Sequence, residues 1–137
     1  MTNAQSKLLD VLKRELEFLN SSGYRRPSWR PQFVFQDSPT CMNRDNPKDP
    51  KPCSECVLMP FVPAESRKNR VPCREIPLNE QGNTIADFYH WGTREELEDE
   101  LAVWLATQIR NLESKGTAAK AYAVGNETQK QSSATAA

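Results

Sequence analysis

The sequence contains a single histidine, no excess of either charge and no long apolar run. Its 18 Lys and Arg residues balance 18 Asp and Glu residues, so the chain as a whole offers no general attraction for nucleic acid or an anionic membrane. No stretch of about 18 apolar residues occurs, so no segment is expected to span a bilayer. The HExxH, GxSxG, P-loop and GxGxxG motifs are absent. We therefore expect no membrane association, and the sequence favours a role other than catalysis.

The first residues also lack the apolar core of a secretory signal peptide. We therefore expect a cytoplasmic protein, in a compartment that keeps thiols reduced. Disulfide formation is then the less favoured use of the four cysteines, although it stays open as an alternative.

Helical periodicity is present near both ends of the chain, and it predicts amphipathic helices over residues 3–21 and 93–115. Each helix has a capping-box sequence, Thr2 with Gln5 and Thr93 with Glu96. Leucines at 3–4 spacing form the apolar face of the first helix, and charged residues, Glu15 among them, are assigned to its solvent-facing sides. The apolar stripe of the second helix comprises Leu97, Leu101, Trp104, Leu105, Ile109 and Leu112.

Two shorter elements are expected between these helices. Thr84 is a suitable N-cap for a short helix over residues 84–91, which Gly92 would end. The aromatic and β-branched residues 33–35 are typical of a short strand. Gly23 lies where a C-terminal cap of the first helix belongs.

The middle of the chain is rich in proline and poor in apolar runs. All 10 prolines lie between Pro27 and Pro77, a stretch that also holds all 4 cysteines. A segment of this kind needs an additional stabilising element, such as a metal, disulfides or a partner, because it buries too little apolar surface to offset the entropy cost of ordering. We expect a mainly α fold with a small irregular or β metal-binding module over 33–78, in a single metal-stapled domain over 1–115. Residues 116–137 are expected to form a disordered tail, with a frayed Ala-rich helix around residues 117–124 as the alternative.

The cysteines are the strongest candidates for a functional site. Their spacing is Cys41-x11-Cys53-x2-Cys56-x16-Cys73, which contains one CxxC chelating pair and two isolated thiols. Two residues between thiols allow one tight turn to direct both sulfurs at one metal. We expect Cys41, Cys53, Cys56 and Cys73 to form a four-thiolate metal site. Only the CxxC pair has a recognisable spacing, and the other two are assigned by elimination.

The identity of the metal is open at this point. Structural zinc is the first expectation, and an iron–sulfur cluster is the alternative, because thiolate ligands suit both. A redox-active pair at Cys53 and Cys56 is less favoured, since no βαβ pattern precedes it. Unliganded reduced cysteines are the least favoured interpretation. His90 is considered as a fourth or alternative ligand, but a partly buried position at the end of a helix is the simpler expectation.

The expected function is that of a small zinc-binding accessory or adaptor protein acting through protein–protein interaction. A protein partner or a homodimer is expected, because so short a chain does not readily cover all of its apolar surface. The first alternative is an iron–sulfur protein in electron transfer or redox sensing. The second is a nucleic-acid-binding regulator that uses the aromatic and basic segment 24–30.

Overall fold

The computed structural model describes residues 2–27, 29–44 and 48–124, and its regular secondary structure there is helical. Helix α1 spans Asn3–Asn20, α2 spans Ile85–Trp91 and α3 spans Arg94–Val124. The connection between α1 and α2 contains short 3₁₀ helices: η1 Gly23–Arg25, η2 Cys53–Glu55, η3 Met59–Phe61, η4 Ala64–Ser66 and η5 Pro72–Glu75. The expected mainly helical fold is confirmed, whereas the metal-binding character of the middle segment stays a prediction.

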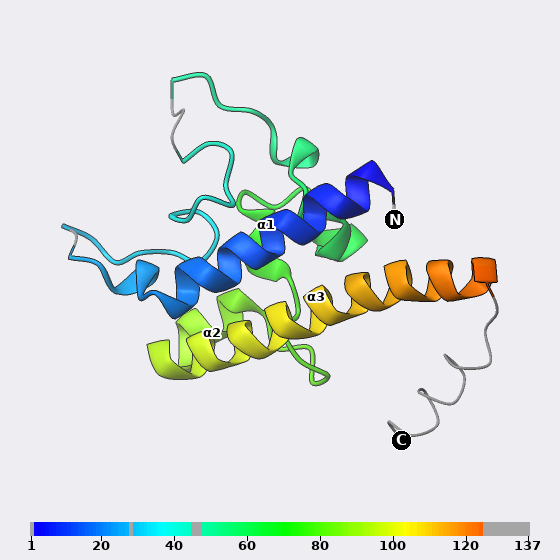
Figure 1. Cartoon of the computed structure of the whole chain (residues 1–137). Coiled ribbons are helices and arrows are strands. Elements are labelled where there is room, and N and C mark those ends of the chain that lie inside the picture. Colours follow the sequence, from blue (N-terminus) through cyan, green and yellow to red (C-terminus); the bar gives the residue numbers. More distant parts are fainter. Residues whose placement is uncertain (1, 28, 45–47, 125–137) are drawn as a thin grey trace.

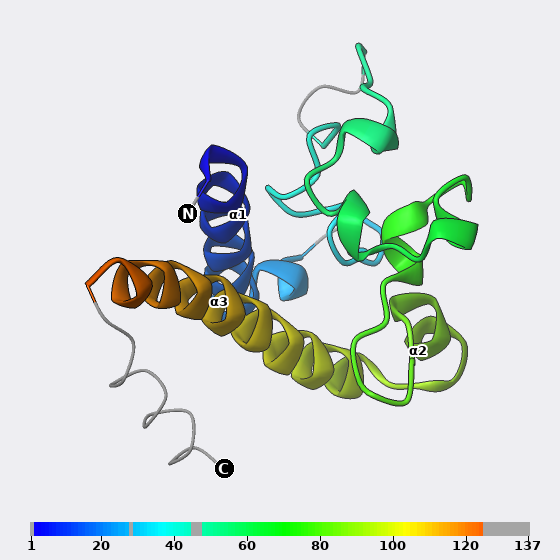
Figure 2. The same ribbon diagram turned by 90° about the vertical axis from the view of Figure 1, so that its right-hand side faces the viewer.

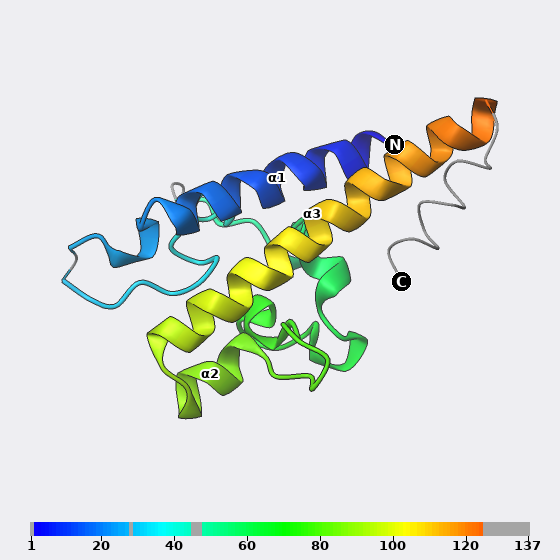
Figure 3. The ribbon, with the colours of Figure 1, turned by 60° about the horizontal axis from the view of Figure 1, so that its bottom comes forward.

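Helices α1 and α3 pack against each other and run in roughly opposite directions (Figures 1 and 3). Their apolar faces meet, and Leu12, Leu101 and Leu105 are completely buried between them and the rest of the core. Lys13 also forms an ion pair of 3.0 Å with Glu113 across the two helices. Both side chains are about half exposed, so this pair contributes little stability and the apolar contact holds the helices together.

The proline-rich segment lies on one side of the α1–α3 pair (Figure 2). Trp104 of α3 joins the two, because its ring packs edge-on against Phe35 and Phe61 with centroid distances of 6.3 and 4.9 Å. Leu58 and Ile76, which flank the cysteine positions, are almost wholly buried in the same core. The segment is therefore attached to the helices through a few large apolar side chains rather than through a sheet.

The predicted helix starts are confirmed. Thr2 and Gln5 form a reciprocal capping box at α1, and Thr93 and Glu96 exchange hydrogen bonds of 2.8 and 3.1 Å at the start of α3. Thr84 caps α2, whose last turn ends at Gly92 as expected. These starts could be predicted because a capping box links residues only three positions apart.

The end of α3 differs from the expected boundary at residue 115. The backbone continues as a helix through Gly116 to Val124. One glycine costs a helix about 1 kcal/mol, which the flanking Ala and Lys residues, good helix formers, can offset. The backbone of the first part of the predicted tail thus follows the alternative of a helix around residues 117–124, and residues 125–137 lie outside the described residues. No helix in the described part of the chain has the length and apolar character needed to cross a bilayer.

The predicted strand over residues 33–35 is wrong. Within the described residues there is no strand, and Phe35 adopts a left-handed backbone conformation with φ of 65° inside a tight turn. Side chains take the place of a neighbouring strand: the Val34 N–H donates to Tyr89 Oη, and the Phe35 N–H donates to Tyr24 Oη, each at 2.9 Å. Aromatic and β-branched content favours a strand only where a second strand is available for pairing.

Gly23 does not cap α1 as expected, because Ser22 takes the left-handed conformation with φ of 63°. The glycine is required for a close approach instead, since a Cβ placed there would lie 2.6 Å from Cζ of Phe18. We expect Gly23→Ala to lower the free energy of unfolding by about 1–3 kcal/mol through overpacking, measured by urea denaturation.

A double-mutant cycle controls this prediction. In a Phe18→Leu background the smaller side chain makes room for the methyl group, so the cost of Gly23→Ala should fall markedly. An equal cost in both backgrounds would contradict the steric explanation.

Candidate metal centre

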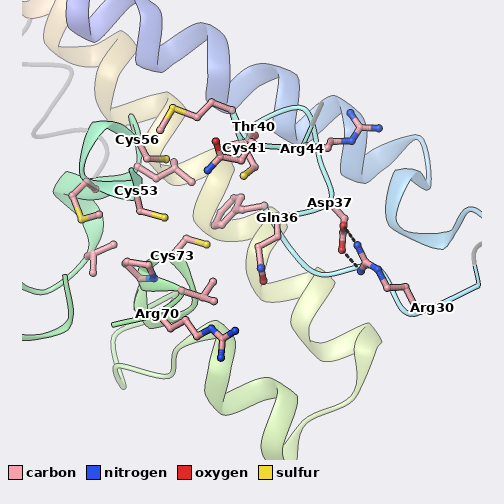
Figure 4. Close-up of a pocket in the computed structure, with 18 residues that line it drawn as sticks. Arg30, Gln36, Asp37, Thr40, Cys41, Arg44, Cys53, Cys56, Arg70 and Cys73 are labelled. Carbon is pink, nitrogen blue, oxygen red and sulfur yellow. Dashed lines mark hydrogen bonds and ion pairs between the residues drawn. The ribbon is translucent and has the colours of Figure 1, made fainter. Parts of the chain in front are cut away.

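The four cysteines lie around one cavity of about 360 Å³. Figure 4 shows Cys41, Cys53, Cys56 and Cys73 surrounding a common space. Cys53 is exposed and the other three are partly buried, and all four thiols are free. The structure thus places the two isolated cysteines, which sequence reasoning assigned by elimination, on the same cavity as the CxxC pair.

The CxxC pair is shaped by the turn η2. The Cys56 N–H donates to the Cys53 carbonyl at 2.9 Å, so both side chains emerge from one 3₁₀ turn. The backbone N–H of Leu58 donates to the sulfur of Cys56. Hydrogen bonds of this kind to a ligand sulfur stabilise its thiolate and help to set the potential of a bound cluster.

Cys73 is held by η5 and by its neighbour Arg74. The Arg74 guanidinium donates to Gln36 Oε1 at 3.0 Å and stacks on the rings of Phe33 and Tyr89, at 4.6 and 5.5 Å from their centroids. These contacts fasten the turn bearing Cys73 to the segment that precedes Cys41. Cys41 and Cys73, which are 32 positions apart in the sequence, thereby meet at one cavity.

Cys41 is positioned through a buried carboxylate on α1. Glu15 is only 1% exposed, and it accepts hydrogen bonds from the hydroxyls of Tyr24, Ser38 and Thr40. Ser38 and Thr40 lie just before Cys41, whose N–H donates to the Ser38 carbonyl at 3.2 Å. The segment just before Cys41 is therefore attached to the middle of α1 by hydrogen bonds.

The electrostatics of the cavity reflect its partial burial. Burial, and after it the neighbouring cysteines, raise the pKa of the Cys73 thiol to about 12. The pKa of Cys56 is also raised, again chiefly by burial. Several thiolates in a partly buried cavity repel one another unless a cation compensates their negative charge. A bound metal ion supplies the positive charge.

The cavity wall combines apolar and basic groups. Apolar side chains, including Phe35, Leu58 and Val62, form its floor. The polar residues that line it are Arg30, Gln36, Asp37, Thr40, Asn43, Arg44 and Arg70. Two hydrogen bonds from Arg30, of 2.6 and 2.9 Å, lower the pKa of Asp37, so this carboxylate is already paired.

All four thiols line one cavity, and their fit to a single metal ion can be compared with the geometry of zinc. A single tetrahedral zinc ion holds its sulfurs at about 2.3 Å, which places them roughly 3.8 Å from each other. Within the described residues, no set of three or more Cys, His, Asp or Glu side chains is gathered so that it could hold one metal ion. In an iron–sulfur cubane each thiolate binds a different iron atom, so the four sulfurs stand farther apart.

The other candidates from the sequence lie elsewhere. His90 is exposed in the last turn of α2 and is not among the residues that line the cavity. In the segment 24–30, Tyr24 is buried against Glu15, and Arg25 pairs with Glu95 and Glu98 at 3.7 and 3.1 Å. Carboxylates thus already neutralise part of the charge that the nucleic-acid hypothesis requires.

Sequence reasoning missed Glu15 and Arg74 as supports of the site. Glu15 was assigned to the solvent side of its helix, but it lies about one turn from each of the core residues Leu12 and Leu19. A carboxylate at a position between two core leucines is a usable signal of a buried polar network. The role of Arg74 could have been recognised more simply, because this residue directly follows the ligand candidate Cys73.

Comparisons with protein-family models, with curated proteins and with solved structures find no match for this chain.

Proposed function

We propose that this protein binds an iron–sulfur cluster through Cys41, Cys53, Cys56 and Cys73 and serves as a one-electron carrier or redox sensor. The observation that carries the proposal is the arrangement of all four thiols around one cavity of about 360 Å³. A cubane cluster binds one iron to each of four thiolates, so it requires four cysteines that face a common space.

Three further features support a cluster. The partly apolar wall limits water, and the Leu58 N–H bonds to the Cys56 sulfur, which are two of the factors that set cluster potentials. Arg44 and Arg70 line the cavity. Their positive charge would offset the net charge of about −2 that four thiolates give to a common four-iron cluster.

A structural zinc site in an adaptor protein is the second candidate. It is favoured by exposed aromatic side chains, since Trp29 is 90% exposed and Trp91 is 58% exposed. Exposed tryptophans are frequent anchors of protein–protein contacts. On this alternative the thiols would close in on one ion, and the partner would bind the tryptophans.

Metal analysis of anaerobically purified protein separates the two candidates. A cluster predicts brown protein with broad absorption near roughly 400 nm, and about four iron atoms and four sulfides per chain. Colourless protein with about one zinc per chain would overturn the proposal in favour of structural zinc. Protein from cells grown with added iron and with added zinc should give the same answer if the preference is intrinsic.

His90→Ala provides the control for this assay. The imidazole is exposed and lies away from the cavity, so the iron content and the spectrum should not change. A loss of metal in this variant would mean that the ligand set has been assigned wrongly.

A further inference from the structure

Exposed basic side chains are frequent in the two segments that flank the cysteine pair, and two of them, Arg44 and Arg70, line the cysteine cavity. We call this set the basic rim, and its members are Arg44, Lys48, Lys51, Arg67, Lys68 and Arg70. All six are exposed, and none forms an ion pair with a carboxylate of the described residues. Over the described residues from 44 to 70, these six positive charges face three negative ones, Asp49, Glu55 and Glu65.

The rim is tied directly to the cavity. Arg44 and Arg70 line it. The side chain of Asn43, another lining residue, bonds to both the carbonyl and the N–H of Lys51, at 2.9 and 2.7 Å. This brings Lys51 beside the segment that carries Arg44, and Lys51 is also only two residues before the exposed Cys53.

The opposite charge collects at another end of the molecule. The first seven residues of α3, 94–100, include five carboxylates and one arginine. Figures 1 and 2 show the start of α3 well away from the loop that precedes Cys53. A chain with no net charge is thus polarised, and such a distribution orients a charged partner as it approaches.

We infer that the basic rim is the docking surface for the acidic face of a one-electron carrier protein. The inference rests on the proposed cluster. Cys53 is the exposed ligand candidate, so the cluster edge that it holds would lie nearest to a partner seated on the rim. One electron passes from the reduced cluster to the oxidised carrier, and no bond or proton is transferred.

An acidic protein fits this surface better than nucleic acid does. Nucleic-acid grooves combine basic residues with exposed aromatic rings on which bases stack. The large exposed apolar side chains of the described residues are Trp29, Tyr89, Trp91 and Val103, and none belongs to the rim. Carboxylates interspersed in the rim would also repel a phosphate backbone, whereas a protein partner can match a mixed pattern.

The first test uses two small oxidants of opposite charge, hexacyanoferrate(III) and hexaammineruthenium(III). Each removes one electron from the dithionite-reduced cluster in a stopped-flow experiment. Added salt should slow the reaction with the anion and speed that with the cation, because the rim attracts one and repels the other. In Lys51→Glu/Arg70→Glu the rate with the anion should fall by about tenfold.

Arg94→Glu/Arg110→Glu is the matched control, because it makes the same change in net charge on α3. It should leave both rates and their salt dependence nearly unchanged. Equal salt dependence for the two oxidants, or equal effects of the two double variants, would overturn the inference even if the cluster is present.

A binding measurement tests the docking surface independently of the proposed cluster. Labelled poly-L-glutamate and a single-stranded oligonucleotide of equal charge are titrated at low salt, with no electron transfer involved. We expect poly-L-glutamate to bind more tightly, and Lys51→Glu/Arg70→Glu to weaken it by about tenfold. Tighter binding of the oligonucleotide overturns the choice of partner. Colourless, zinc-containing protein overturns the electron carrier together with the proposed function.

Discussion

Cys73→Ser is expected to abolish cluster binding and to destabilise the metal-loaded protein far more than the metal-free protein. A hydroxyl is a poor ligand for iron or zinc, whereas its size is close to that of the thiol it replaces. The lost stability should be on the order of 5 kcal/mol or more, since structural zinc contributes roughly 10–16 kcal/mol of apparent binding free energy in small domains. A whole domain has only about 5–15 kcal/mol of stability.

The measurement is urea denaturation of four samples, wild type and Cys73→Ser, each with and without metal. Without metal the substitution should cost less than about 1 kcal/mol, because only packing changes. Equal costs with and without metal would show that Cys73 is a core residue and not a ligand. His90→Ala again serves as the variant that should leave both forms unchanged.

Glu15→Ala is expected to be the most damaging single substitution outside the cysteines. It removes the acceptor shared by Tyr24, Ser38 and Thr40. Ser38 keeps the Phe35 carbonyl as an acceptor, whereas the buried Tyr24 hydroxyl and the partly buried Thr40 hydroxyl lose theirs. Each buried unsatisfied group costs about 1–3 kcal/mol, so the total should reach about 3–5 kcal/mol. Iron binding should weaken as well, because the approach to Cys41 loses its attachment to α1.

Two related variants make this prediction specific. Glu15→Gln keeps one carbonyl acceptor and should cost less than Glu15→Ala. Glu17→Ala removes an exposed carboxylate from the same helix and should change stability by less than about 0.5 kcal/mol. If Glu15→Ala and Glu17→Ala had similar effects, the buried network would not be the support that its hydrogen bonds indicate.

The segment 33–38 shows why sequence pattern failed in the middle of the chain. Its aromatic residues indicate a strand, but the N–H groups of Val34 and Phe35 bond to tyrosines 55 and 11 residues away. Phe35 accepts an unfavourable backbone conformation because its ring is then buried, 1% exposed, against Trp104. Propensity is a local quantity, and here a distant contact outweighs it.

In the candidate site, too, the part formed by local contacts could be predicted and the part formed by distant contacts could not. The CxxC pair could be recognised from its spacing, because a single turn is enough to bring Cys53 and Cys56 together. Nothing local relates Cys41 to Cys73. Their meeting at one cavity depends on Glu15 and Arg74, whose hydrogen-bond partners lie 9 to 38 positions away in the sequence.

The sequence by itself determined the helices and their starts, because capping boxes and 3–4 periodicity act over one or two turns. It also determined the cysteine-bearing, proline-rich character of the middle segment. The tertiary structure alone decided which polar groups are buried, which arginines are already paired and that all four cysteines line one cavity. Those features arise where distant segments close on one another, and the burial that favours such contacts exists only after the core has formed.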